Sequence, residues 1–126
     1  MKLTPVLIVE EIEKSLPFWM ERLGFAKTVE VPEGPRLAFV ILVKDGAELM
    51  LQTRESIRKD APETLPPEGA GITSLFVVVE DFDDLLKRIE GCEIILPERT
   101  TWYGMREIAV REPSGHTVVF AMMVPK

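Results

Sequence analysis

The residues best suited to chemistry lie in one run, Trp102-Tyr103-Gly104-Met105-Arg106-Glu107. Its two neighbouring aromatic side chains could stack on a planar molecule. Arg106 and Glu107 carry opposite charges, but neighbours in a strand point to opposite faces of the sheet, so they cannot form a simple catalytic pair. The run therefore favours recognition of an organic molecule over acid–base chemistry.

Groups for nucleophilic or acid–base catalysis are scarce in the chain. The single histidine, His116, follows Gly115 in a turn, where turn chemistry and exposure to solvent would explain it. The acidic pair Glu10-Glu11 is better explained as a helix cap and a solvated residue than as a general acid and base. No Ser/His/Asp or Cys/His arrangement is available beyond His116. We therefore expect no catalytic residues.

The elements that would position these residues occur twice. In each half an apolar run meets an acidic residue, a helical segment ends at a glycine, and a turn with a glycine leads into a last apolar strand. The matching positions are Glu11 and Asp81, Gly24 and Gly91, and Gly46 and Gly115, which are 70, 67 and 69 residues apart. This repeat predicts two similar units, because one unit alone would leave an apolar face exposed.

Hydrophobic periodicity predicts eight strands and two helices. We expect strands over residues 3–9, 25–31, 37–43 and 48–52 in the first half, and over 72–79, 92–96, 105–111 and 117–123 in the second. The fold class is therefore α+β, with two tandem βαβββ units forming curved antiparallel sheets. We expect a single domain over residues 1–126, with unit one at 1–53, a linker at 54–70 and unit two at 71–126.

The two helices are predicted from their caps. Pro17 would break a helix interior, so we expect a turn at residues 11–14, Ser15 as the cap, and Pro17 in the first turn of a short helix that ends at Gly24. Asp81 is a good cap for a second helix over residues 82–90. The linker would contain a helical turn around residues 56–59.

Composition and charge narrow the function classes. The net charge of −6 argues against nucleic acid and against an anionic membrane surface, and it is compatible with a cationic ligand. The single cysteine, Cys92, excludes an internal disulfide framework. No stretch is long enough to span a bilayer and the N-terminus lacks a secretory signal, so we expect a cytoplasmic protein.

Three stretches of the chain resemble one known superfamily. They are the segment that ends in Leu23-Gly24-Phe25, the strand and cap at residues 76–81, and the run from Trp102 to Glu107 that leads to Glu112-Pro113-Ser114-Gly115-His116. They are similar to motifs of the glyoxalase/bleomycin resistance/extradiol dioxygenase superfamily, also called vicinal oxygen chelate, and closest to those of its bleomycin-resistance-like members. Tyr103 is an insertion relative to the shorter Trp-Gly form of the motif.

The resemblance implies a metal site that this chain lacks the residues to build. Enzymes of the superfamily hold a divalent ion with His, Glu or Gln from the first and last strand of each unit. Counting along the repeat places Thr4, Met50, Ser74 and Val119 at those four positions. Hydroxyl, thioether and valine side chains do not hold a catalytic divalent ion. We therefore expect no metal and no cofactor.

Without a metal, the four positions would form the floor of an apolar pocket with two hydroxyl groups. Phe39, Phe76 and Met105 could add walls, and Trp102 and Tyr103 could form a rim. The predicted ligand-binding residues are Thr4, Phe39, Met50, Ser74, Phe76, Trp102, Tyr103, Met105 and Val119.

The resemblance implies a protein that binds and sequesters an aromatic or cationic antibiotic-like molecule, more a binder than an enzyme. It also implies a homodimer, with no nucleic acid or membrane as partner. Two alternatives stay open. One is a metal-dependent lyase, isomerase or dioxygenase with a shifted metal site, built from Glu48 or Gln52 with Glu107. The other is a structural or regulatory module whose cavity is filled by side chains.

Overall fold

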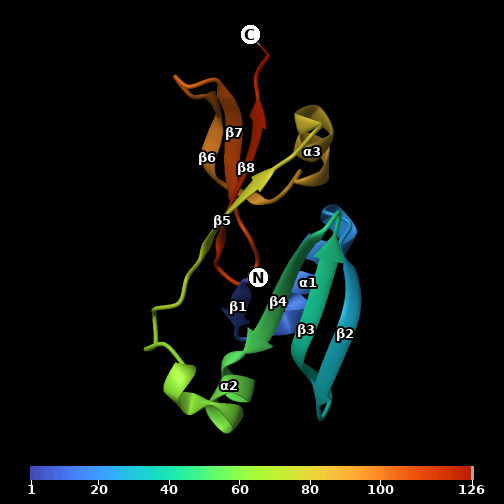
Figure 1. Cartoon of the computed structure of the whole chain (residues 1–126), viewed down its shortest axis with the longest axis vertical. Coiled ribbons are helices and arrows are strands. Elements are labelled where there is room, and N and C mark those ends of the chain that lie inside the picture. Colours follow the sequence, from blue (N-terminus) through green and yellow to red (C-terminus); the bar gives the residue numbers. More distant parts are fainter. Residues whose placement is uncertain (126) are drawn as a thin grey trace. The chain divides into compact units, whose positions relative to one another are not determined.

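The computed structural model describes residues 1–125, which divide into two compact units (Figure 1). The first unit covers Met1–Ile72 and the second begins at Thr73. Each unit contains one four-stranded sheet and its own helices. None of the helices among these residues has the length and apolar character that a membrane span needs.

The first unit begins with a strand, continues through a helix, and completes its sheet with three further strands. Its sheet has the order β1-β4-β3-β2. Strand β1 runs parallel to β4, and the other neighbours are antiparallel. The elements are β1 (Val6–Val9), α1 (Ile12–Leu16), the π-helix η1 (Pro17–Arg22), β2 (Ala26–Glu33), β3 (Arg36–Lys44), β4 (Ala47–Thr53), α2 (Arg54–Asp60) and the 3-10 helix η2 (Pro62–Thr64).

The second unit repeats this topology. Its sheet has the order β5-β8-β7-β6, again with the first strand parallel to the last and the rest antiparallel. The elements are β5 (Ser74–Val78), α3 (Phe82–Arg88), β6 (Glu93–Thr100), β7 (Met105–Arg111) and β8 (Thr117–Met123). The predicted α+β class and the βαβββ order are therefore confirmed. One parallel pair in each unit makes the sheets mixed, which corrects the expectation of wholly antiparallel sheets.

Pro17 changes the helix of the first unit in a way that differs from the prediction. The helix begins at Ile12, with Glu11 in extended conformation before it, and Ser15 lies buried inside it rather than capping it. A proline has no N–H and its ring crowds the carbonyl four residues earlier. The chain accommodates Pro17 by widening into the π-helix η1, where Leu23 N donates to Phe18 O at 3.2 Å. The predicted stop at Gly24 is confirmed, with φ +80.

Two other local predictions are confirmed. Asp81 caps α3, because its carboxylate accepts a hydrogen bond from Asp84 N at 2.9 Å. Asp45 and Gly46 form the two-residue turn between β3 and β4, both with positive φ, as a type I′ hairpin requires. This turn fixes the register that places alternate residues of β3 and β4 on the two faces of their sheet.

Each unit has an apolar core between its sheet and its first helix. In the first unit, α1 lies against β3 and β4 (Figure 1). Trp19 of η1 is buried there and meets Phe18 and Phe25 edge to face. In the second unit, Phe82 of α3 and Phe120 of β8 are buried. Because α1 in the first unit and α3 in the second each cover one face of their sheet, a binding surface within a unit would use the opposite face.

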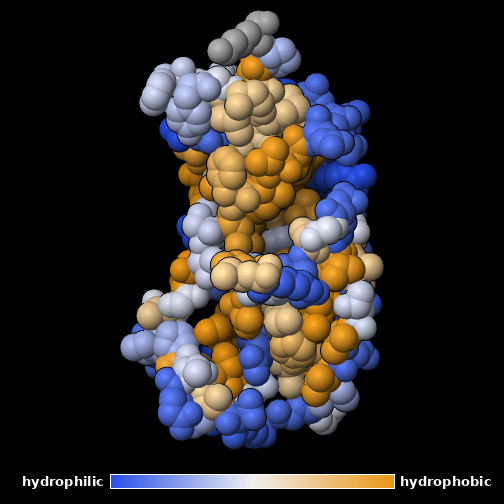
Figure 2. Space-filling view, viewed as in Figure 1, coloured by the Kyte–Doolittle hydropathy of each residue, from blue (hydrophilic) through white to orange (hydrophobic). Residues whose placement is uncertain are grey.

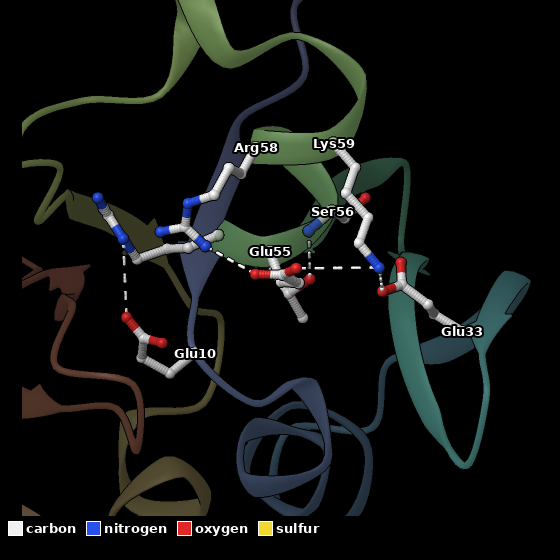
Figure 3. A network of polar contacts seen from close by, with 8 residues as sticks. Glu10, Glu33, Glu55, Ser56, Arg58 and Lys59 are labelled. Carbon is white, nitrogen blue, oxygen red and sulfur yellow. Dashed lines mark hydrogen bonds and ion pairs between the residues drawn. The ribbon is translucent and has the colours of Figure 1, made fainter.

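Helix α2 is capped by Thr53, buries Ile57 and carries a network of exposed ion pairs (Figure 3). Arg54 pairs with Glu10 after β1 at 3.7 Å, and Lys59 pairs with Glu33 of β2 at 2.7 Å and with Glu55 at 3.8 Å. The hydrogen bond that Lys59 Nζ donates to Glu33 raises the pKa of Lys59. Exposed pairs of this kind contribute little to stability.

The antiparallel outer strands, β2 and β6, are irregular. Strand β2 has register shifts between Lys27 and Val29 and between Val31 and Pro32. Strand β6 has shifts between Ile94 and Leu96 and between Leu96 and Arg99, and it contains Pro97. A proline and a bulge interrupt the row of backbone donors and acceptors along an edge.

Candidate binding faces

The sheet of the first unit has an open face opposite α1, and at one end of it Gln52 donates a hydrogen bond to Ser56 of α2 at 3.1 Å. In β4, Leu49 and Leu51 are buried toward the helices, and the residues between them point the other way. On that side Met50 lies between Val6 of β1 and Ile41 of β3, and Gln52 lies opposite Phe39. We call this surface the first open face; its principal residues are Val6, Val29, Phe39, Ile41, Met50 and Gln52.

A small polar cluster lies at one end of the first open face. Glu48 of β4 accepts a hydrogen bond from Thr4 Oγ1 at 3.0 Å and pairs with Lys2 Nζ at 2.9 Å. The hydrogen bond from Lys2, and then that from Thr4, lowers the pKa of the Glu48 carboxyl below its ordinary value of 4.5. Thr4 therefore orients a carboxylate, a contact that the sequence did not reveal.

Replacing Glu48 by glutamine should make the melting temperature depend less on pH at acid pH. A carboxyl whose pKa is lowered by folding stabilises the protein above its unfolded pKa, and this contribution is lost as the pH falls through the folded value. The melting temperature of the wild-type protein should therefore fall more steeply below about pH 4.5 than that of Glu48→Gln. Thermal unfolding followed by circular dichroism at a series of pH values checks this. Parallel curves for the two proteins would contradict it.

The sheet of the second unit has a matching open face, away from α3. One row across the sheet joins Phe76 of β5 with Val119 of β8, and the next joins Val78 with Ala121 and then with Glu107 of β7. The side chain of Phe76 is 58% exposed. Apolar residues gather over this unit in the space-filling view (Figure 2). We call this surface the second open face: Phe76, Val78 and Met123 are exposed on it, Val119 is half-buried, and Glu107 and Ala121 are buried.

Two aromatic side chains extend from the loop between β6 and β7. Trp102 is 95% exposed, and its ring meets that of Tyr103 edge to face, with centroids 5.2 Å apart. The loop is closed by hydrogen bonds from Thr101 N to Met105 O and from Gly104 N to Thr101 O. An exposed tryptophan on a hydrogen-bonded turn is well placed to stack on a planar molecule.

Arg106 and Glu107 point to opposite faces, as the sequence predicted. Arg106 lies 4.4 Å above the ring of Phe82 and pairs with Asp83 and Glu98, so it holds α3 to the sheet. Glu107 lies on the second open face and pairs with Arg99 of β6. Only the charge on Glu107 is therefore placed where a ligand on this face could meet it.

The predicted binding residues fall into three sets. Thr4, Phe39 and Met50 belong to the first open face or its border, and Ser74, Phe76, Met105 and Val119 alternate along the second. Trp102 and Tyr103 belong to the loop between β6 and β7. The ligand contacts themselves stay predictions. The sequence did not reveal two contacts of carboxylates: that of Glu48 with Thr4 and that of Glu107 with Arg99.

His116 differs from the sequence expectation. It follows the turn, but it is completely buried, not exposed to solvent. Its Nδ1 accepts a hydrogen bond from Thr73 N at 2.9 Å, and its backbone N–H donates to Glu112 at 3.3 Å. The parallel pairing of β5 with β8 brings Thr73 beside the start of β8. His116 is therefore a structural residue that joins these two strands.

The residues within each unit do not fit a divalent ion. Met50 and Val119 offer no hard donor, and Thr4 and Ser74 offer only neutral hydroxyls. Among residues 1–125, taken within either unit, no three His, Cys, Asp or Glu side chains form a group that could hold a metal. The two carboxylates of the alternative, shifted site, Glu48 and Glu107, are already paired with Lys2 and Arg99.

The repeated units, the open sheet faces and the aromatic loop define a known class of protein. The chain belongs to the glyoxalase/bleomycin resistance protein/dioxygenase superfamily, whose family model matches residues 3–120. Bleomycin resistance proteins of Geobacillus stearothermophilus and Staphylococcus aureus are 27% identical to it, over 95% of both chains.

Solved structures with the same fold carry diverse names. TioX from Micromonospora sp. ML1 has a TM-score of 0.78 at 20% identity, and the match covers 98% of this chain and 99% of that one. Lactoylglutathione lyase from Agrobacterium tumefaciens has a TM-score of 0.76 at 16% identity, over 97% of this chain and 92% of that one. At these identities the likeness establishes the fold alone.

Proposed function

We propose that the protein binds and sequesters a small aromatic or cationic molecule of the antibiotic type without transforming it. The observation that carries the proposal is Trp102, an almost fully exposed aromatic side chain on a hydrogen-bonded turn that leads into β7. Such an arrangement suits a planar organic molecule, which would bury apolar area and stack on the ring. Binding alone needs no proton transfer, so the scarcity of catalytic groups is no obstacle.

Two further observations support this proposal. Neither open face presents a set of metal-binding side chains within its own unit, which disfavours the metal-dependent lyase, isomerase or dioxygenase reading. The net charge of −6 favours a cationic over an anionic ligand. The similarity to bleomycin resistance proteins makes metal-free bleomycin a suitable first probe.

The test is a titration with metal-free bleomycin, followed by tryptophan fluorescence. Trp19 is buried and only 1% exposed, so a ligand that stacks on Trp102 should change the emission of the exposed ring. We expect a saturable change at micromolar drug. A flat titration, confirmed by calorimetry, would reject sequestration of this drug and favour a structural or regulatory module.

The proposal includes a homodimer in the cytoplasm. A chain with a single cysteine has no disulfide framework, which suits a reducing compartment. Exposed apolar side chains on β2, Val29 and Val31, would gain from cover by a second copy. Sedimentation or size-exclusion chromatography with light scattering should give twice the mass of 14.2 kDa. A monomer at all concentrations would reject this part alone.

A further inference from the structure

One carboxylate interrupts the apolar second open face. Glu107 is only 4% exposed, and its neighbours across the sheet are Ala121 and then Val78. A buried charge is costly unless it is paired, and an acid on an apolar face therefore needs an explanation. Its position makes Glu107 a candidate for recognition of a ligand.

The pairing of Glu107 leaves half of the carboxylate available. Arg99 places Nε at 2.8 Å and Nη2 at 2.6 Å from the same oxygen, Oε1. No hydrogen bond from residues 1–125 reaches the other oxygen, Oε2. No side-chain oxygen among these residues is both fully buried and without a partner, so Oε2 is not sealed off, although the Glu107 side chain is only 5% exposed. A donor that takes the place of the exposed Arg99 can therefore reach the carboxylate.

The partner of Glu107 is itself weakly held. The side chain of Arg99 is 55% exposed, and it extends from the outer strand β6 just after a register shift. An exposed guanidinium loses little when it moves into water. An incoming cation could therefore replace it, and the carboxylate would stay paired throughout the exchange.

We propose that Glu107 is a cation-binding subsite on the second open face, with Arg99 as an internal counter-ion that the ligand displaces. The ligand is an organic cation with a flat apolar body: its charged N–H group binds Glu107, and its body covers exposed side chains such as Phe76 and Met123. The apolar surroundings strengthen this charged hydrogen bond. This inference rests on the proposed function, and it specifies the chemical class of the ligand that the protein would bind.

Two probes of the same shape test the subsite. The flat molecule 9-aminoacridine is a cation at mildly alkaline pH, whereas acridine is neutral there. Calorimetry should show that the wild-type protein binds 9-aminoacridine about tenfold more tightly than acridine. The Glu107→Gln variant should bind the two within about twofold of each other, with the affinity for acridine unchanged. The Arg99→Ala variant should bind the cation more tightly than the wild type does.

The matched control is Glu93→Gln on the same strand as Arg99. Glu93 forms an exposed pair with Arg111 at 3.2 Å, so this change removes the same charge elsewhere on the sheet. It should leave both affinities within about twofold of wild type. The subsite is rejected if Glu93→Gln and Glu107→Gln weaken the cation equally, if Glu107→Gln weakens both probes alike, or if the wild type does not discriminate.

A fallback measurement and a comparison with bleomycin cover the remaining outcomes. If Glu107→Gln does not fold, thermal unfolding of Arg99→Ala replaces it: 9-aminoacridine should raise the melting temperature of this variant more than that of the wild type, and an equal or smaller rise rejects the subsite. If neither acridine binds but metal-free bleomycin gives a saturable titration, the subsite fails and the proposed function stands. If bleomycin also fails, both are rejected.

Discussion

The His116→Ala variant is expected to lose about 3 kcal/mol of unfolding free energy, the largest stability effect that we predict. The substitution removes the acceptor for Thr73 N–H, which His116 Nδ1 binds at 2.9 Å, and leaves a cavity at a completely buried site. The carbonyl of Thr73 also accepts from Thr117 N at 2.9 Å, which keeps Thr73 in place. Its N–H therefore cannot turn easily to another acceptor, and the loss should be large. Urea unfolding followed by circular dichroism measures it.

The control for this prediction is His116→Asn. The amide oxygen of asparagine can take the place of Nδ1, so this variant should recover part of the lost stability, whereas its volume is still smaller than that of histidine. A loss below about 1 kcal/mol for His116→Ala would contradict the structural role. Equal losses for the alanine and asparagine variants would show that the cavity, and not the hydrogen bond, is responsible.

The Trp102→Ala variant is expected to bind metal-free bleomycin about tenfold to a hundredfold more weakly than the wild type. The ring offers a large apolar surface that is already ordered, and truncation removes the stacking partner that the proposed function requires. Since the side chain is 95% exposed, stability should change by no more than about 0.5 kcal/mol. Calorimetry is the suitable measurement, because the variant lacks the exposed fluorophore.

Trp102→Phe separates stacking from other effects of the substitution. A phenylalanine keeps a flat ring, so this variant should bind more tightly than Trp102→Ala and more weakly than the wild type. Equal binding by the alanine variant and the wild type would show that the ligand does not use the loop. In that case the exposed tryptophan would have no part in recognition, and the proposed function would lose its main support.

Much of the fold could be predicted because the strongest local signals agree with the topology. Asp45-Gly46 demands a tight hairpin, Asp81 a helix start and Gly24 a helix end, and the structure has each of them. Pro17 was harder: sequence rules treat a proline as a break or as a first-turn residue, whereas the chain keeps a continuous helical path by adding one residue to the turn.

The candidate site was less accessible because it depends on pairing between distant residues. Counting along strands identifies the face of Glu107, since alternation is a local property. Its partner Arg99 is set by two register shifts in β6, and although Pro97 marks the second of them, the sequence does not reveal which residue then faces Glu107. The same holds for His116, because the contact with Thr73 follows from the parallel pairing of β5 with β8 rather than from the turn that precedes it.

The irregular outer strands β2 and β6 affect how readily the protein would aggregate at high concentration. Fibre growth requires a straight strand edge whose backbone groups can form hydrogen bonds with a strand of another chain. Pro32 and Pro97 remove amide donors from these two edges, and the register shifts twist the remaining ones out of line. Under the proposed function, each protein molecule binds one ligand and the protein must accumulate to be effective. These two edges would then be protected from seeding its precipitation.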